Sequence, residues 1–355
     1  TYSDWDDVSC GMKQAVQTYK EDATIAKYGT IENWDTSKVT NMLSAFRFLT
    51  TTFDEDLSKW NVSNVITMDE MFMNSKLNLF TSDLSKWNVG KVTSMRFMFQ
   101  SGGSFNSDLS KWNVEKVISM ENMFYSNNKF NSDLSKWNIE NVKSMRAMFY
   151  RNNVFTSDLS KWNVEKLENT NQMFRGARTF TSDLSKWNVK NVEDMSAMFY
   201  DAHAFTSDLS KWNVGKVTAM DRMFDTSAIS ISDLSKWNVE KVRYMVGMFR
   251  KAQFFTSDIS KWNVGKVTLM QEMFKEASAF TSDISKWNVG KVTLMQEMFE
   301  KAYAFTSDIS KWNVENVENM QEMFDSASSF TIDISSWNVG SVSTFLNMFS
   351  STSYA

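Results

Sequence analysis

The sequence predicts an α/β solenoid, a right-handed stack of roughly 25-residue coils that each carry one short parallel strand and one short helix. Thirteen tryptophans recur at spacings of 26, then 27, then 25 residues, from Trp34 to Trp337. Apolar residues hold fixed places around each of them, and residues 255–274 and 280–299 are identical. Because one coil cannot bury both its strand and its helix, we expect neighbouring coils to share one core.

Residues 1–30 are predicted to form a helical cap over the first coil. Val8, Met12 and Val16 recur at helical spacing, and Asp7 or Ser9 would serve as the N-cap. An open-ended stack needs such a cover for its first apolar face.

The coils themselves are predicted to span residues 31–350. In the second coil, the spacing Leu-x-x-Trp-x-Val-x-x-Val over residues 57–65 is typical of a leucine-rich-repeat strand, with Trp60 and Val62 pointing inward and Asn61 outward. Residues 65–72 then carry apolar side chains at i, i+3, i+6 and i+7, which predicts a short helix. A loop returns to the next strand and holds a further Phe, as at Phe80 and Phe105. The Trp and Met columns are expected to form the core.

No such cover is expected at the other end. Residues 351–355 read as a tail directly after the thirteenth coil, so an apolar end should remain open. Either another copy docks there or this chain is part of a longer one. The candidate end-to-end contact is made of Trp337, Phe345, Met348 and Phe349.

Composition and residue pattern argue against several classes of function. A net charge of -4 and a pI of about 5.3 give no general attraction to nucleic acid, and no apolar run reaches the length of a membrane span. Cys10 is the only cysteine, so neither an internal disulfide nor a cysteine zinc site is expected. Carboxylates recur in register rather than in opposed pairs, and no nucleophile lies beside a base in the pattern. We therefore expect a non-enzymatic protein without a cofactor or a metal.

Equivalent residues of successive coils form columns along the stack. Two such columns, which point outward beside the tryptophans, form the candidate binding face. It consists of Lys86, Asn88, Lys111, Asn113, Lys136, Asn138, Lys161, Asn163, Lys186, Asn188, Lys211 and Asn213. These columns are constant from coil to coil, whereas the predicted helix varies, as in "SMRFMF" and "SMENMF". A constant face suits a periodic ligand or no ligand, and it argues against a receptor shaped for one folded partner.

Both polar columns also have structural interpretations. The Asn column is expected to form a stacked amide ladder, each side chain bonding to the next coil, with a binding surface as the alternative. The Asp column, which begins at Asp56 and Asp83, places like charges about 5 Å apart. Each Asp is expected to cap its own turn by accepting the N–H two residues on, and a row of bound cations is the alternative.

The strings "DLSKWNV", "KVTSMRFMF" and "YGTIENWDTSKVTNM" resemble the BspA-like surface proteins, a leucine-rich-repeat relative with a 25-residue unit. The resemblance covers residues 8–350, approximately. It implies secretion or display at the cell surface, adhesion and protein contact, and no catalytic residues. Asp35 keeps the Asp that often follows Trp in that family, whereas later coils carry Asn.

Two functions follow as hypotheses. The first is an extracellular or cell-surface scaffold, structural or adhesive, that contacts other surface proteins and self-associates. The alternative is a binder of a periodic ligand, such as an acidic polysaccharide, mineral or ice, through the Lys/Asn face.

Overall fold

The computed structural model describes residues 11–47, 49, 53–74, 82–103, 105–229 and 232–352. The predictions that concern Asp7, Val8, Ser9, Phe80 and most of the 351–355 tail lie outside the described residues.

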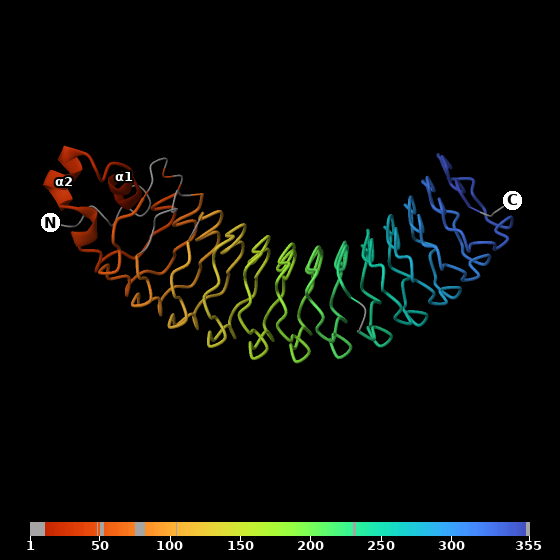
Figure 1. Cartoon of the computed structure of the whole chain (residues 1–355), viewed down its shortest axis with the longest axis horizontal. Coiled ribbons are helices and arrows are strands. Elements are labelled where there is room, and N and C mark those ends of the chain that lie inside the picture. Colours follow the sequence, from red (N-terminus) through yellow and green to blue (C-terminus); the bar gives the residue numbers. More distant parts are fainter. Residues whose placement is uncertain are drawn as a thin grey trace. The chain divides into compact units, whose positions relative to one another are not determined.

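The chain divides into two compact units. The first comprises Thr1–Leu167 with Gly176–Ser182, and the second comprises Glu168–Arg175 with Asp183–Ala355. Each unit is a stack of coils, one behind the next along the chain (Figure 1). Isolated parallel bridges join successive coils, from Asn41–Thr67 to Ser119–Ser144 in the first unit and from Asn169–Asp194 to Asn319–Thr344 in the second. The chain is therefore a repeat solenoid, as the tryptophan spacing predicted.

Helices are confined to the start of the first unit among the described residues. They are α1 (Gly11–Gln17), α2 (Asp22–Tyr28) and a short 3₁₀ helix, η2 (Ile31–Asn33) (Figure 1). Met12 and Val16 of α1 are buried, in agreement with their predicted inward positions. The separate helix α2 was not predicted.

The predicted helix in each coil is replaced by what we call a ladder segment, residues 66–74 and the equivalent residues of the other coils. Alternate amides of the ladder segment donate to the next coil: the N–H groups of Met68, Glu70 and Phe72 reach the carbonyls of Ser94, Arg96 and Met98 at 3.0, 2.7 and 2.9 Å. The amides between them close turns within the coil, as from Met71 N–H to the Met68 carbonyl at 3.2 Å. Every second backbone bond thus ties two coils together, which an α-helix cannot do because its N–H groups point along its own axis.

The ladder segment also contains two residues with positive φ. In the second coil these are Glu70 and Asn74, with φ of 58° and 52°, and equivalent residues of the other coils share the conformation. Glu70 is the third residue of the turn from Met68 to Met71, where a type II turn requires a positive φ. Turns of this length repeat apolar residues every three or four positions, so they imitate the spacing of a helix.

The predicted strand at each Trp is likewise not formed. Trp60 and Val62 are buried and Asn61 between them is exposed, as expected for alternate residues. However, the bridges lie in the ladder segments, as at Thr67, and none of the described residues near Trp60 forms a strand. The coil is therefore built from turns and extended single stretches, and the predicted right-handed sense of the stack stays a prediction.

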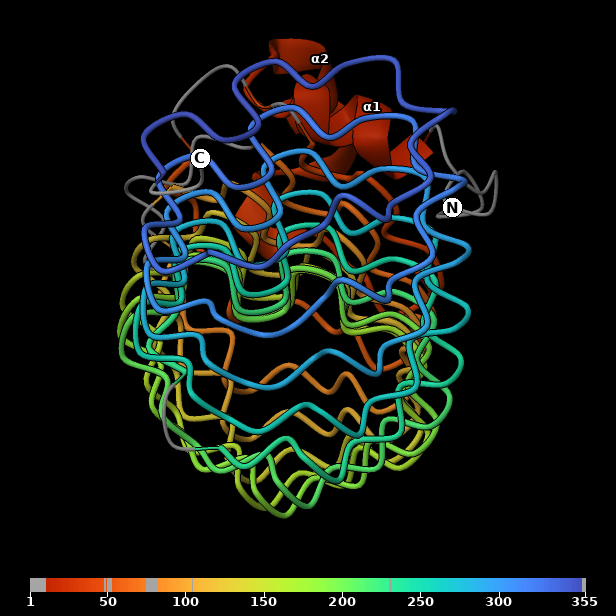
Figure 2. The ribbon, with the colours of Figure 1, turned by 90° about the vertical axis from the view of Figure 1, so that its right-hand side faces the viewer.

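Stacked aromatic side chains fill the core, as predicted. Indole rings of neighbouring coils lie nearly parallel, with Trp87 and Trp112 at 6.4 Å and 5° in the first unit, and Trp262 and Trp287 at 6.5 Å and 1° in the second. Successive coils of a unit follow nearly the same path, which brings equivalent side chains into register (Figure 2). The Met column is buried in the same way, for example at Met95.

Candidate functional site

The predicted Lys/Asn face is exposed along its whole length. All twelve side chains, from Lys86 and Asn88 to Lys211 and Asn213, belong to exposed residues. Yet the amide oxygens are already engaged, because Asn88 Oδ1 accepts the Gly90 N–H of its own coil at 3.2 Å and Asn113 Oδ1 accepts the Glu115 N–H at 3.1 Å. This bond within the coil differs from the predicted ladder between coils. The face offers lysine ammonium groups more readily than amide acceptors.

The Asp column caps turns, as predicted. Asp158 Oδ1 accepts the Ser160 N–H at 2.9 Å, and Asp83 Oδ1 accepts the Ser85 N–H at 2.9 Å. The backbone and hydroxyl hydrogen bonds from Ser160 lower the pKa of Asp158, with a smaller contribution from Lys161. These donors and the lysine stabilise the charged form of Asp158.

Side chains, rather than backbone groups, connect the coils on the tryptophan side. Trp212 Nε1–H donates to the Leu184 carbonyl one coil earlier at 3.0 Å. The Leu184 N–H donates to the Ser207 hydroxyl of the next coil at 2.8 Å, and that hydroxyl donates to Asp183 Oδ1 at 3.1 Å. The pattern recurs in other coils, for example from Trp87. The bridging role of these serines was not predicted, although their recurrence directly before the Asp column is visible in the sequence.

The ladder segments carry the variable side chains, and their charge is uneven. In the fourth and fifth coils, residues 118–129 and 143–154 hold Lys129, Lys143, Arg146 and Arg151 against one carboxylate, a net charge of +3. We call these four exposed residues the basic patch. Beside them the rings of Tyr125 and Tyr150 stack at 4.3 Å, and the Arg151 guanidinium lies over Tyr150 at 5.4 Å.

The eleventh and twelfth coils have the opposite charge. Residues 293–304 and 318–329 hold five carboxylates and one lysine, a net charge of -4. We call these carboxylates the acidic patch: Glu297, Glu300, Glu318, Glu322 and Asp325.

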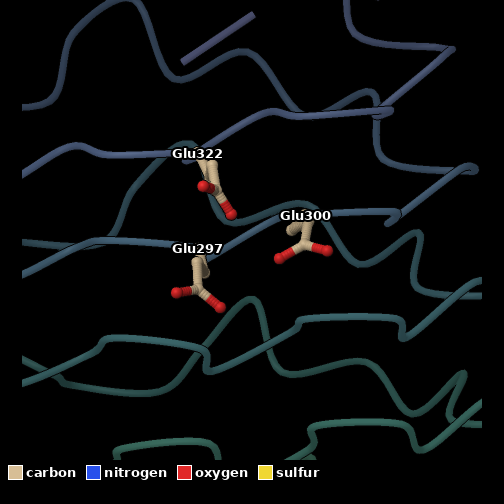
Figure 3. A group of neighbouring side chains, drawn as sticks. All are labelled: Glu297, Glu300 and Glu322. Atoms are coloured by element: carbon tan, nitrogen blue, oxygen red, sulfur yellow. The ribbon is translucent and has the colours of Figure 1, made fainter. Parts of the chain in front are cut away.

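Three members of the acidic patch lie close enough together to suggest a metal site. The side chains of Glu297, Glu300 and Glu322 come from adjacent coils, with carboxylate oxygens within 4.8 Å of one another (Figure 3). However, the Lys275 ammonium pairs with both Glu297 and Glu300, and Lys301 Nζ lies 2.8 Å from Glu300. Although burial opposes it, these ammonium groups lower the pKa of Glu300. Lysine ammonium groups therefore already contact two of the three carboxylates that a metal ion would need.

A buried ionic network lies next to this patch. Asp225 is fully buried between Arg222 and Arg250, whose guanidinium nitrogens are 3.5 and 3.4 Å from it. Burial raises the pKa of Asp225 even though both arginines favour its charged form. Arg222 also reaches Glu272 two coils away at 3.3 Å, and it passes Gly247, whose missing side chain leaves room for it.

The candidate end-to-end contact is only partly exposed. Phe345 is 44% exposed and Phe349 half-buried, whereas Trp337 and Met348 are 8% and 6% exposed. Leu346, which was not predicted, is 59% exposed. The equivalent of Phe345 one coil earlier, Met320, is completely buried. The apolar surface at this coil therefore centres on Phe345 and Leu346.

Two open pockets lie near the helices of the first unit. One of about 340 Å³ lies between α1 and α2 and is lined by Gln14, Thr18, Lys27 and Tyr28, among others. Another of about 240 Å³ includes Tyr19, Lys20 and Glu55. Lys20 pairs with Glu55 at 3.5 Å beside the second pocket. None of the helices formed by the described part of the chain is long and apolar enough to span a bilayer.

Comparisons with solved structures return leucine-rich-repeat proteins at low similarity. A leucine-rich repeat protein from Bacteroides ovatus is 14% identical, with 77% of this chain and 78% of that chain covered and a TM-score of 0.37. TLR13, solved as a complex with ssRNA13, is 13% identical over 76% and 42% of the two chains, with a TM-score of 0.26. The functional domain of InlJ from Listeria monocytogenes is 11% identical over 82% and 60%, with a TM-score of 0.24. No curated protein is significantly similar in sequence.

One family model matches nearly the whole chain. It matches residues 10–137, 119–232, 206–306 and 279–354, and it carries the description "Mycoplasma protein of unknown function, DUF285". No named relative confirms the BspA-like resemblance itself. The stacked 25-residue coils and these matches lead to one conclusion: the chain belongs to the DUF285 family of repeat proteins.

Proposed function

We propose that this chain is a non-enzymatic scaffold outside the cell, which contacts protein partners through its ladder segments and adheres by doing so. The observation that carries the proposal is the difference between the two sides of each coil, which are joined to the next coil by backbone bonds on the ladder side and by side-chain bonds on the tryptophan side. Backbone bonds hold the ladder segments in place whatever their side chains are, so this side can vary to fit a partner. Exposed apolar residues on it, such as Ile118 at 48% and Tyr244 at 41%, support the same reading.

Self-association is the second part of the proposal. In the terminal coil of this chain, Val339, Phe345 and Leu346 are 36%, 44% and 59% exposed. Exposed apolar residues that cluster on one coil favour association, because covering them removes their surface from water. The occupant that we propose is a second copy of the 355-residue chain.

A bead-aggregation assay tests the proposal. Beads coated with the chain are expected to clump, and the double variant Phe345→Ser, Leu346→Ser is expected to reduce clumping. The matched double variant Lys86→Ser, Lys111→Ser alters two exposed residues of the constant face and should leave clumping unchanged. Beads that stay dispersed, together with a monomer in light scattering at high protein concentration, would argue against adhesion by self-association.

Location is tested separately. Antibody labelling of intact cells that make the full protein is expected to stain the surface before permeabilisation. Staining that requires permeabilisation would contradict the proposed extracellular location.

The periodic-ligand alternative keeps one favourable observation, the exposure of all twelve residues of the Lys/Asn face. A glycan array probed with the chain tests it, because a signal from acidic glycans that disappears in the variant Lys86→Glu, Lys111→Glu, Lys136→Glu would support this alternative. A blank array would leave the protein-contact proposal as the better account.

A further inference from the structure

The basic and acidic patches occupy the same part of the coil. Glu318 stands in the column of Lys143, seven 25-residue repeats further along. Apart from Lys129, both patches lie on ladder segments whose backbones bond from coil to coil in the same pattern, as from Asn122 to Arg146 and from Glu297 to Gln321. Charges on the two patches are therefore spaced by the same repeat.

The acidic patch keeps a net charge of -3 when both Lys301 and Lys275, which contacts it from the preceding coil, are counted. Lys275 contacts Glu297 and Glu300 of the acidic patch, and Lys301 contacts Glu300. Glu322 accepts a hydrogen bond from the Gln321 amide, and Asp325 accepts one from the Ser326 hydroxyl. Like charges about 4 Å apart repel by about 1 kcal/mol even in water, so the patch gains from an added cation.

The basic patch has the complementary chemistry. Arg146 and Arg151 are exposed, and the Arg151 guanidinium is held over Tyr150. The Cγ of Arg151 lies 3.2 Å from the position that a Cβ on Gly176 would take, so the glycine leaves room for this arginine. Arginine beside tyrosine is the composition of an energetic centre in protein interfaces, and arginine binds carboxylates through two parallel hydrogen bonds.

We propose that the basic patch of one copy binds the acidic patch of a second copy. This contact specifies the partner in the self-association proposed above and rests on that function, but it uses charge rather than the apolar terminal coil. It joins two different surfaces and is therefore heterologous, so it can continue from copy to copy. A long polyanion fits less well, because the charge of the equivalent residues changes sign along the chain: residues 243–254 carry three cations and no carboxylate, whereas residues 193–204 carry three carboxylates and no lysine or arginine.

Charge reversal with complementation tests the contact. The first variant is Arg146→Glu, Arg151→Glu and the second is Glu318→Lys, Asp325→Lys. Each new residue already occurs in its column, as Glu121, Glu276, Lys143 and Lys275, so the coils accommodate all four changes. The control is Lys86→Glu, Lys111→Glu on the constant face, which makes the same change in charge as the first variant.

Sedimentation velocity of the full chain at low ionic strength gives the readout. The wild-type chain should associate as its concentration rises. Its affinity for itself should fall by about tenfold or more between 50 and 300 mM salt, since exposed charges are screened. Each charge-reversed variant alone should lose the salt-sensitive part of the association, an equimolar mixture of the two should recover it, and the control should behave as wild type.

Three results would overturn the contact: a wild type that stays monomeric at low salt, a mixture that fails to associate, or a control weakened as much as the first variant. Association that survives both charge reversals but disappears in Phe345→Ser, Leu346→Ser would reject this contact while leaving the proposed function intact. A heparin fragment that binds the wild type and loses affinity equally in the first variant and the control would also reject it in favour of a general polyanion surface.

Discussion

The two sides of a coil are hydrogen-bonded to neighbouring coils through different atoms. On the tryptophan side, the bonds between coils come from side chains: Trp212 Nε1 and the Ser207 hydroxyl each bridge to the preceding coil. On the ladder side they come from the backbone, as from Met220 N–H to the Tyr244 carbonyl at 3.0 Å. A side chain that bridges coils cannot change without losing its bond, whereas a backbone bond tolerates many side chains. This difference explains why one side of the repeat is constant and the other varies.

The largest effect should follow loss of a bridging indole. Trp212→Ala removes a buried ring and the indole bond to the Leu184 carbonyl, which keeps only the Trp187 N–H as donor, so the free energy of unfolding should fall by about 3–5 kcal/mol. Trp212→Phe keeps most of the ring and should lose less. Chemical denaturation measures both.

The matched substitution on the ladder side is Arg243→Thr, an exposed position whose column already holds Thr268. It should change the free energy of unfolding by less than about 0.5 kcal/mol. An equal loss for Trp212→Phe and Arg243→Thr would contradict the comparison.

A smaller effect is expected from the serine bridge. Ser207→Ala leaves the buried Leu184 N–H without its acceptor and should lower the free energy of unfolding by about 1–3 kcal/mol. Ser210→Ala removes an exposed bond to Asp208 within one coil and serves as the control. If thermal melts rank the two variants in the opposite order, the bridging serines are not what holds this side together.

Relieving backbone strain on the ladder side should raise the free energy of unfolding rather than lower it. Ala197 has a φ of 53°, a conformation that costs a non-glycine residue about 1–2 kcal/mol. Ala197→Gly should therefore raise the free energy of unfolding by up to about 1 kcal/mol. Ala219→Gly makes the same change at a bridge residue without positive φ, and should lower it by about 0.5–1 kcal/mol. Melting temperatures of the pair that move in the same direction would refute the assigned turn geometry.

The smallest expected effect is the loss of thermal stability at acidic pH. Serine donors lower the pKa of Asp233, Asp258 and Asp283 in the folded chain below that of the unfolded chain. The stability that these groups contribute is therefore complete above the unfolded pKa, about 3.9, and is lost as the pH falls through the folded values. The melting temperature should decline below about pH 4. Changing all three to Asn, which keeps an acceptor but cannot titrate, should make that decline shallower; an unchanged acid profile would show that the Asp caps do not control it.

The sequence predicted the stack and its core because both follow from the repeat itself. Tryptophans and phenylalanines that recur every 25 residues must align once the coils stack, and Trp262 over Trp287 shows that they do. The exposed Lys and Asn columns and the Asp caps could be predicted for the same reason.

The ladder segment could not be predicted, because turns that close over three residues repeat apolar side chains at nearly the helical spacing. Residues as different as Phe97, Ala147 and Glu272 adopt positive φ there, so no residue type marks the position. The sequence also contains both charged patches, but it does not show that Lys275 is shared by Glu297 and Glu300. Pairings of that kind depend on which columns meet across coils.

Saturation mutagenesis of one internal coil, residues 207–228, with a thermal-stability readout tests the central claim most directly. If side chains hold the coils together on one side and backbone bonds on the other, Ser207 should tolerate few substitutions, whereas Ala219 should tolerate most. Equal tolerance at Ser207 and Ala219 would contradict the account.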